Sequence, residues 1–383
     1  MPSMTSATAA AMPRSGIREI MDLAWQTPTC IHLEVGEPDF ATPTHIIDAA
    51  ADALRGGWTK YTPNAGIPAL LEAIADKVAR NNHIPARTDQ ITVTVGGVEA
   101  IYIALVAVTE PGDAVLVPDP GWPNYRMMTH LLHLDAQLYP LRREERFVPV
   151  IDDLEPLVTP RTRAIIVNSP SNPVGSIIGA DRLAAIGDFA RRHSLVVVSD
   201  EAYEQITFEP GFVSTASVTD PGRVISCFTF SKSYAMTGWR IGYLVAPPEL
   251  ASITRKLQEP LISCVSAPTQ MAALAALRGP QTVIEEMVTA YLRRRDAVIA
   301  RLDRHSIEHA HPQGAFYAWV RIAGFAADAR KFALRLLVER EVAVAPGSAF
   351  GPSGEGWIRL SLATAESQLL EGVDRLIDFM TKG

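Results

Sequence analysis

Between residues 45 and 290 the chain alternates short apolar runs with longer segments of helical periodicity. Runs such as 91–95, 114–118 and 195–198 have the length and the β-branched composition of buried strands. Strands that alternate with helices in this way form parallel sheets, because each crossover between parallel strands needs a helix. The sequence therefore predicts an α/β fold with a mostly parallel sheet that is flanked by helices on both faces.

The chain has 383 residues, which is beyond the size at which a single hydrophobic core stops growing. We therefore expect two domains. Residues 45–290 form the large domain, residues 14–44 and 291–383 form a smaller α+β domain, and the small residues at 1–13 form a flexible N-terminal arm. Residues 249–278 and 283–304 are expected to be helical, and the second of these, a long helix, is expected to carry the chain from the large domain to the small one.

The charge and the cysteines narrow the class of protein. The 35 basic and 42 acidic residues leave a net charge of −7, which disfavours a surface that binds nucleic acid. Cys30, Cys227 and Cys264 are scattered and form no CxxC motif, so we expect neither disulfides nor a metal site. His130 and His133 could share a helix face, but no third metal ligand lies near them in the sequence.

The localisation expected from the sequence is cytoplasmic. The N-terminus has no basic start followed by an apolar core, as a secretory signal would. The longest purely apolar stretches are far shorter than a membrane span, so no membrane association is expected.

One lysine stands out in the segment 224–247. Lys232 lies in a Ser/Thr-rich turn between two apolar runs that have the character of buried strands, and Arg240 follows eight residues later. A lysine at the end of a buried strand loses solvation, which lowers its pKa and frees the amine to act as a nucleophile and a base. The alternative is an ordinary lysine that reaches solvent from a loop.

The sequence around this lysine, SKSYAMTGWRIGY, resembles the lysine signature of class I aminotransferases. These are aspartate-aminotransferase-like enzymes of fold type I, which use pyridoxal 5'-phosphate (PLP), and further motifs follow in the family's order from Gly36 to Arg359. The resemblance implies a site in the cleft between two domains. It makes Lys232 the lysine that forms a Schiff base with PLP, and it makes Arg240, with Thr229 or Ser231, a ligand of the cofactor phosphate.

Two earlier segments fit the same cofactor. Gly96 and Gly97 form a turn that opens an apolar helix, and the free N–H groups of a helix N-terminus favour an anion. Two glycines alone are weak evidence, but the resemblance makes Gly96, Gly97 and Val98 backbone donors to the phosphate. Trp122 follows the next strand. It could simply pack in the core, whereas the resemblance stacks it on the pyridine ring, beside the substrate.

Three polar residues follow the central strands. Asn172 could be a turn residue before a proline; the resemblance has it bind the phenolic oxygen of the cofactor and contact the substrate. Asp200 could cap a helix, but the carboxyl end of a central strand is where α/β proteins bind ligands. The resemblance makes Asp200 the ionised partner of the pyridine nitrogen and Tyr203 a second ligand of the phenolic oxygen, and counts both among the catalytic residues.

Gly36, Arg359 and Tyr61 complete the predicted site. The resemblance places Gly36 where the substrate carboxylate passes the backbone, and a side chain there would obstruct it. Arg359 lies in an apolar strand, where a buried arginine needs an anion. A structural ion pair would serve as well; the resemblance makes Arg359 the ligand of the substrate α-carboxylate. It also makes Tyr61 a ligand of the cofactor phosphate in a partner subunit, which implies a homodimer with shared sites.

The function that we infer is the transfer of an amino group from an L-amino acid to a 2-oxo acid by a ping-pong mechanism through Lys232. A PLP-dependent lyase, decarboxylase or oxidase could use the same cofactor site. A PLP-sensing transcription factor would need a further basic domain, and a structural or binding protein would not need Lys232, Asp200 and Arg359 together. Val98 stands where an aspartate-specific branch of the family has a lysine, so neutral, aromatic or basic substrates remain open.

Overall fold

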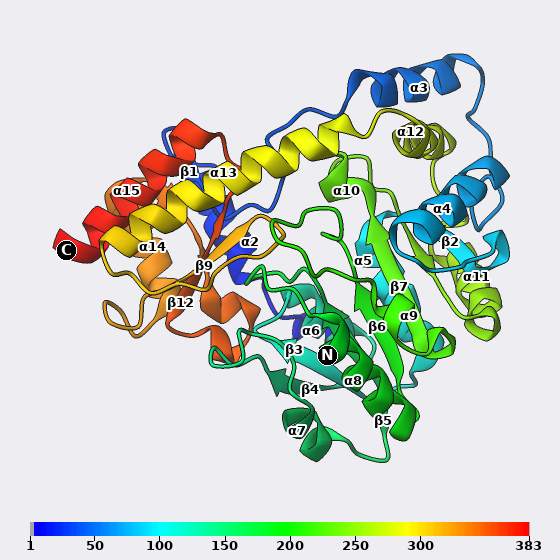
Figure 1. Ribbon diagram of the computed structural model, residues 1–383, viewed down its shortest axis with the longest axis horizontal. Coiled ribbons are helices and arrows are strands. Elements are labelled where there is room, and N and C mark those ends of the chain that lie inside the picture. The colour runs from blue at the N-terminus through cyan, green and yellow to red at the C-terminus, as the bar shows by residue number, and fades with distance from the viewer. Residues whose placement is uncertain (1–3, 383) are drawn as a thin grey trace.

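The computed structural model describes residues 4–382, and its centre is a seven-stranded sheet with the strand order β2-β8-β7-β6-β5-β3-β4 (Figure 1). Strand β8 runs antiparallel to both of its neighbours, and the other neighbouring pairs are parallel. In sheet order the strands are β2 (Ile91–Thr94), β8 (Gly242–Val245), β7 (Val224–Thr229), β6 (Val196–Asp200), β5 (Thr162–Asn168), β3 (Ala114–Asp119) and β4 (Asp135–Pro140). The mostly parallel sheet predicted from the sequence is confirmed.

Both faces of this sheet are buried, as the apolar runs indicate. In β5, Ile165 and Val167 pack in one hydrophobic cluster, whereas Ala164 and Ile166 pack in another on the opposite face. Helices α5 (Gly96–Val108), α6 (Pro123–Leu131) and α11 (Pro248–Ile262) cover the second face. The first face is covered mainly by α4 (Pro68–Asn81), α8 (Ala180–Arg192) and α12 (Ala267–Arg278).

Shorter or more peripheral helices complete this part of the chain. They are α3 (Thr44–Arg55), which packs on α12, and α7 (Ile151–Leu154), α9 (Thr215–Val218) and α10 (Phe230–Ser233).

A second, smaller part of the structure combines both ends of the chain. Its three-stranded antiparallel sheet has the order β11-β12-β9, and a two-stranded parallel sheet pairs β1 with β10. The strands are β1 (Ile31–His32), β9 (Tyr317–Arg321), β10 (Val342–Ala343), β11 (Ala345–Pro346) and β12 (Trp357–Ser361). The helices are α2 (Gly16–Ala24), α14 (Ala329–Arg340) and α15 (Glu366–Lys382). These pairings support the predicted two-part small domain, whose boundaries stay a prediction.

Helix α13 (Thr282–Arg304) is 23 residues long and extends from the seven-stranded part into the smaller part (Figure 1). Ile284 near its start packs with the large cluster, whereas Tyr291, Val298 and Leu302 pack with the cluster of the smaller part. One rigid helix therefore links the two hydrophobic cores.

The structure differs from the sequence-based expectation in two places. The helical segment expected across 249–278 is interrupted between α11 and α12, where Ser263 has a φ of 63°. Pro260 removes a backbone donor from the last turn of α11, and Pro268 fits only the first turn of a new helix. The arm also contains a helical turn, α1 (Ala7–Ala10), which packs on α6.

His130 shows what holds this turn in place. Its Nε2 lies 2.9 Å from the carbonyl oxygen of Thr8, so this histidine of α6 makes a structural contact with α1. Among residues 4–382, no group of His, Cys, Asp and Glu side chains is arranged to hold a metal ion. Nor does any helix in these residues have the length and apolar character needed to cross a membrane.

Candidate active site

A cavity of about 380 Å³ lies at the carboxyl ends of the central strands, where the smaller part of the structure meets the sheet. Strands β5, β6 and β7 end at this edge of the sheet with Asn168, Asp200 and Thr229, all of which line the cavity. Of the residues predicted from the sequence, the structure brings these to the cavity wall: Gly36, Gly97, Val98, Trp122, Asn172, Asp200, Tyr203, Thr229, Ser231, Lys232, Arg240 and Arg359.

Lys232 projects into the cavity from α10, the helical turn that follows β7. Its Nζ donates to the carbonyl oxygen of Gly36 at 2.6 Å. Burial lowers the pKa of Lys232 to about 8, and the positive charges of Arg359 and Arg240 act in the same direction, against the opposing charge of Glu37. A substantial fraction of the amine is therefore neutral near pH 8 and able to act as a nucleophile or base.

Asp200 lies at the end of β6 on the floor of the cavity, and only 6% of its surface is exposed. Its Oδ2 accepts from the hydroxyl of Tyr125 at 2.5 Å, and its Oδ1 accepts from the backbone N–H of Ala202 at 3.1 Å. Burial raises the pKa of Asp200, although both hydrogen bonds and the charge of Lys232 oppose this. A cationic group in front of the carboxylate would keep it ionised.

The start of α5 and the turn after β7 form an anion-binding end of the cavity. A side-chain carbon on Gly96 would lie 2.7 Å from Nη2 of Arg240, so the guanidinium lies against the first residue of the helix. The hydroxyls of Thr229 and Ser231 lie 2.9 Å apart, and Gly97 faces Thr229. Free helix N–H groups, two hydroxyls and a guanidinium together suit a phosphate group.

Arg359 in β12 is 3% exposed and also lines the cavity. Its Nη1 donates to Oδ1 of Asn172 at 2.9 Å, and its Nη2 donates to the carbonyl oxygen of Glu34 at 2.5 Å. Its Nε has no hydrogen-bond partner among residues 4–382. No carboxylate of the described residues pairs with this guanidinium, so a carboxylate ligand would supply the missing anion.

Two predicted site residues do not line the cavity. Gly96 lies behind Arg240, where its φ of 78° and its lack of a side chain allow the close approach of the guanidinium. Tyr61 is 90% exposed and borders a separate surface hollow with Trp58 and Lys60. Within one subunit it does not reach the cavity, and its predicted role across a dimer interface stays a prediction.

A family model described as "Aminotransferase class I and II" matches residues 28–376. The chain is 40% identical over 367 residues to an aspartate aminotransferase of Pyrococcus abyssi, with 94% of each chain covered. The match to the aromatic-amino-acid aminotransferase 2 of Thermococcus litoralis is 39% identical and covers 94% of each chain. The chain belongs to the class I and II aminotransferases. It is an aminotransferase of fold type I.

The same architecture is found in solved structures of the family. The aspartate aminotransferase of Thermus thermophilus, solved with maleate, superposes on this aminotransferase with a TM-score of 0.94 at 34% identity. That match covers 98% of this chain and 99% of the Thermus chain.

Class I and II aminotransferases are PLP enzymes, and the cavity of this aminotransferase fits PLP. The anion-binding end has the donors that a phosphate needs, and Asp200 provides a buried carboxylate for a pyridinium nitrogen. The backbone segments at the anion-binding end are closely packed around Gly242. A side-chain carbon on this glycine would lie 2.6 Å from the carbonyl oxygen of Phe228 and 2.9 Å from the N of Gly97. The chemistry of the donor set thus matches the parts of the cofactor.

Among the cavity and near-cavity residues that the sequence did not predict, three carry polar groups placed to act on the site. Tyr125 of α6 binds Asp200, Tyr317 of β9 lies beside Tyr203, and Arg18 of α2 lines the outer wall. Tyr317 follows the glycine-containing segment GAF at the start of a strand, which is a signal for a close approach of the backbone. Tyr125 and Arg18 lie in ordinary amphipathic helices and carry no such signal.

Proposed function

We propose that this aminotransferase transfers the amino group of an L-amino acid to a 2-oxo acid in two half-reactions on one PLP, which is carried by Lys232. The observation that carries the proposal is the meeting of three groups in one cavity. They are the Lys232 amine, whose pKa is lowered to about 8, the buried carboxylate of Asp200, and the guanidinium of Arg359, which lacks an anionic partner among residues 4–382.

The cofactor is proposed to lie with its phosphate at the N-terminus of α5, Thr229, Ser231 and Arg240. Its ring would lie between Trp122 and the floor of the cavity, with the ring nitrogen at Asp200 and the phenolic oxygen at Asn172 and Tyr203. When bound, PLP supplies an electron-poor ring that takes up the electron pair released at the substrate Cα. Asn172 has its Oδ1 committed to Arg359, which leaves its Nδ2 as the group that can donate.

The side chains of the enzyme supply binding, orientation and proton transfer. Arg359 is proposed to bind the substrate α-carboxylate by a two-point contact and so to fix the Cα in front of Lys232. Lys232, as a neutral amine, would remove the proton from that Cα. It would then return this proton to a carbon of the cofactor. Asp200 holds the ring nitrogen protonated, which keeps the ring able to accept electrons.

The substrate class is proposed from the cavity wall and from the relatives. Relatives of this chain are named for aspartate and for aromatic amino acids, and the Thermus enzyme was solved with maleate, a dicarboxylate. Val98 supplies no cation, but Arg18 lines the outer part of the cavity and forms no ion pair among residues 4–382. We infer that Arg18 binds the distal carboxylate of acidic substrates, and that apolar and aromatic side chains pack at Val98.

The test is a panel of amino donors with 2-oxoglutarate and pyruvate as acceptors, using purified protein supplied with PLP. We expect one oxo acid released for each acceptor aminated. Release of ammonia or CO2 in place of acceptor amination would contradict transamination. Arg18→Gln should raise KM for aspartate about tenfold and leave KM for phenylalanine nearly unchanged. Equal effects on both donors would show that Arg18 does not read the distal carboxylate.

A further inference from the structure

Tyr317 lines the cavity but has no role in the proposed chemistry so far. It lies in β9, is 1% exposed, and lines the same cavity as Lys232, Tyr203 and Arg359. Three contacts define its surroundings: one with the hydroxyl of Tyr203, one with the guanidinium of Arg359, and one with the backbone at Gly36.

The hydroxyls of Tyr203 and Tyr317 lie 2.8 Å apart and form a hydrogen bond in which either oxygen can donate. Burial raises the pKa of both phenols, so each keeps its single proton at neutral pH. The charges of Arg359 and Asp200 act on both hydroxyls, and Lys232 Nζ lies 5.9 Å from the centre of the Tyr203 ring. If Tyr203 donates its proton to the phenolic oxygen of the cofactor, it can only accept in its contact with Tyr317. Tyr317 must then be the donor.

The ring of Tyr317 makes the second contact. The guanidinium carbon of Arg359 lies 4.2 Å from the centre of this ring. Strand pairing explains the contact, because β12 and β9 are antiparallel and Tyr317 faces Ser361, two residues beyond Arg359. Side chains related by this diagonal lie on the same face of a sheet. The ring therefore supports one face of the guanidinium that is proposed to bind the substrate carboxylate.

The third contact of Tyr317 is with Gly36, whose carbonyl oxygen accepts a hydrogen bond from Lys232. A side-chain carbon on Gly36 would lie 2.0 Å from the hydroxyl oxygen of Tyr317, so this hydroxyl fills the space that a side chain would need. The carbonyl oxygen of the same glycine accepts from Lys232 Nζ at 2.6 Å. The position of the Tyr317 hydroxyl is thus defined on one side by Tyr203 and on the other by Gly36.

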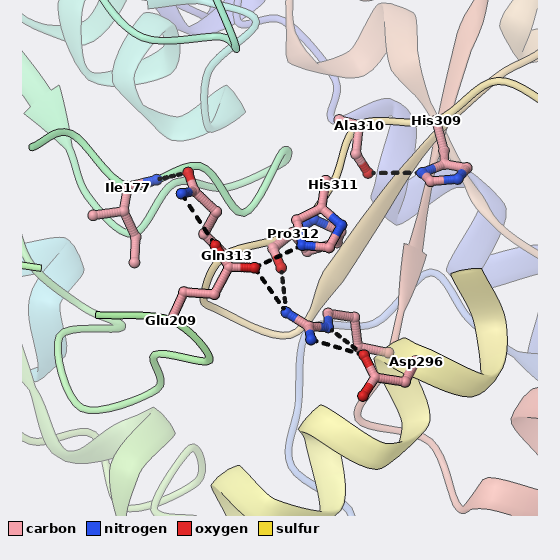
Figure 2. Close-up of polar contacts among 9 residues, drawn as sticks. Ile177, Glu209, Asp296, His309, Ala310, His311, Pro312 and Gln313 are labelled. Carbon is pink, nitrogen blue, oxygen red and sulfur yellow. Dashed lines mark hydrogen bonds and ion pairs between the residues drawn. The ribbon is translucent and has the colours of Figure 1, made fainter. Parts of the chain in front are cut away.

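A cluster of polar contacts outside the cavity holds the segment 311–313, which leads into β9, against Glu209 in the segment that follows Asp200 (Figure 2). The Oε1 of Gln313 accepts from the N–H of Ile177 at 3.3 Å, and its Nε2 donates to Glu209 at 3.4 Å. Arg295 of α13 donates to the carbonyl oxygen of Pro312 at 3.1 Å. Backbone hydrogen bonds from Phe208 to Gln313 and from Ala315 to Ile206, each of 2.8 Å, continue this link toward Tyr203 and Tyr317.

We propose that Tyr317 is a positioning residue that links the substrate arginine to the cofactor: its hydroxyl donates to Tyr203, and its ring supports Arg359. The hydroxyl directs the proton of Tyr203 toward the phenolic oxygen of PLP and makes Tyr203 a stronger donor, because linked hydrogen bonds polarise one another. The ring limits the guanidinium of Arg359 to the plane in which it meets the substrate carboxylate. This inference rests on the proposed function.

The test separates the hydroxyl from the ring with two variants of the PLP-loaded protein. Tyr317→Phe keeps the ring, so KM for the best amino donor should change less than about twofold. The pH midpoint at which the visible band of the bound cofactor titrates should rise by about half a unit to one unit. The reason is that the variant weakens the hydrogen bond from Tyr203 to the phenolic oxygen, which stabilises the deprotonated form of the cofactor. Tyr317→Leu also removes the ring and should raise KM about tenfold.

Two controls make the result specific. Tyr291 lies in the same hydrophobic cluster, and its hydroxyl has no hydrogen-bond partner among residues 4–382, so Tyr291→Phe should change neither the midpoint nor KM. In a Tyr203→Phe background, Tyr317→Phe should cause no further change in the midpoint, because the hydrogen bond is already lost. A purely structural role of Tyr317 would predict equal shifts in both backgrounds.

Two outcomes would overturn the inference, and they differ. If the wild-type protein shows a titrating cofactor band and Tyr317→Phe titrates at the same pH, the link through Tyr317 is wrong while the proposed function stands. If the wild-type protein forms no cofactor band at all, the proposed function fails, and the inference fails with it.

Discussion

Arg359 and Asn172, which are 187 residues apart in the sequence, are joined in the cavity by a hydrogen bond of 2.9 Å between Nη1 and Oδ1. One residue comes from β12 of the smaller part, and the other follows β5 of the central sheet. The bond commits the amide oxygen to the arginine and leaves the amide N–H₂ to donate into the cavity. The proposed substrate ligand and the proposed cofactor ligand thus orient each other.

This arrangement predicts the effect of Arg359→Lys. The lysine cannot reproduce the planar two-point contact with a carboxylate, and it would also leave Asn172 without its partner. We expect mainly a higher KM, with a loss of about 2–4 kcal/mol in kcat/KM for the best amino donor. Steady-state kinetics with that donor provide the measurement. A variant with normal KM would show that Arg359 does not bind the substrate carboxylate.

Asp200→Asn should affect a different step. The variant removes the negative charge that is proposed to keep the ring nitrogen protonated, so loss of the Cα proton should slow while the substrate still binds. We expect a large fall in kcat with little change in KM, measured by steady-state kinetics and stopped-flow absorbance.

Asp119→Asn is the matched control for this prediction. Asp119 ends strand β3, which is separated from β6 by β5, and its buried carboxylate accepts from Ser353 outside the cavity. This variant should lower stability without the specific loss of kcat. If Asp200→Asn releases the Cα proton at the wild-type rate, the role given to Asp200 is wrong.

The pKa of Lys232 predicts a pH dependence in cofactor-free protein. Only the neutral amine attacks PLP, so the rate of covalent attachment should rise with pH and level off above a midpoint of about 8. Between pH 8 and 10.5, the ordinary pKa of a lysine, the folded chain binds fewer protons at this site than the unfolded chain. The contribution of Lys232 to the free energy of unfolding therefore increases with pH across that interval.

Two measurements check this prediction. Stopped-flow reconstitution gives the midpoint of attachment, and borohydride reduction followed by peptide mapping should find the cofactor on Lys232. Lys232→Met should abolish the attachment and remove this increase in stability. A rate that continues to rise to pH 10, or a label on another lysine, would contradict the assignment.

Tyr61 predicts a shared site in a homodimer. Its side chain is 90% exposed and lies outside the cavity of its own subunit. Lys232→Ala and Tyr61→Ala subunits should each have low activity, whereas a mixture should recover part of it, because one site of the mixed dimer carries both native residues. Size-exclusion chromatography and mixing of tagged subunits provide the measurement. Proven exchange of subunits without recovery would rule out the shared site.

Much of the fold follows from local pattern. The apolar runs of β5, β6 and β7 predicted buried parallel strands, and polar residues at their ends predicted a site at that edge of the sheet. The break between α11 and α12 was missed, although Pro260 and Pro268 mark it, because the apolar pattern continues on both sides. Periodicity reports which residues are buried, and it is less sensitive to where a helix ends.

The sequence by itself determined the strand–helix order, the lysine motif and twelve of the residues of the cavity wall, because these depend on neighbours along the chain or on a family motif. Only the tertiary structure decided which hydroxyl meets Tyr203, which carbonyl accepts from Lys232, and which guanidinium meets Asn172. Each of those pairs joins segments more than 100 residues apart. A hydrogen bond depends on position to within a few tenths of an ångström, and that position is determined by packing across the two hydrophobic cores.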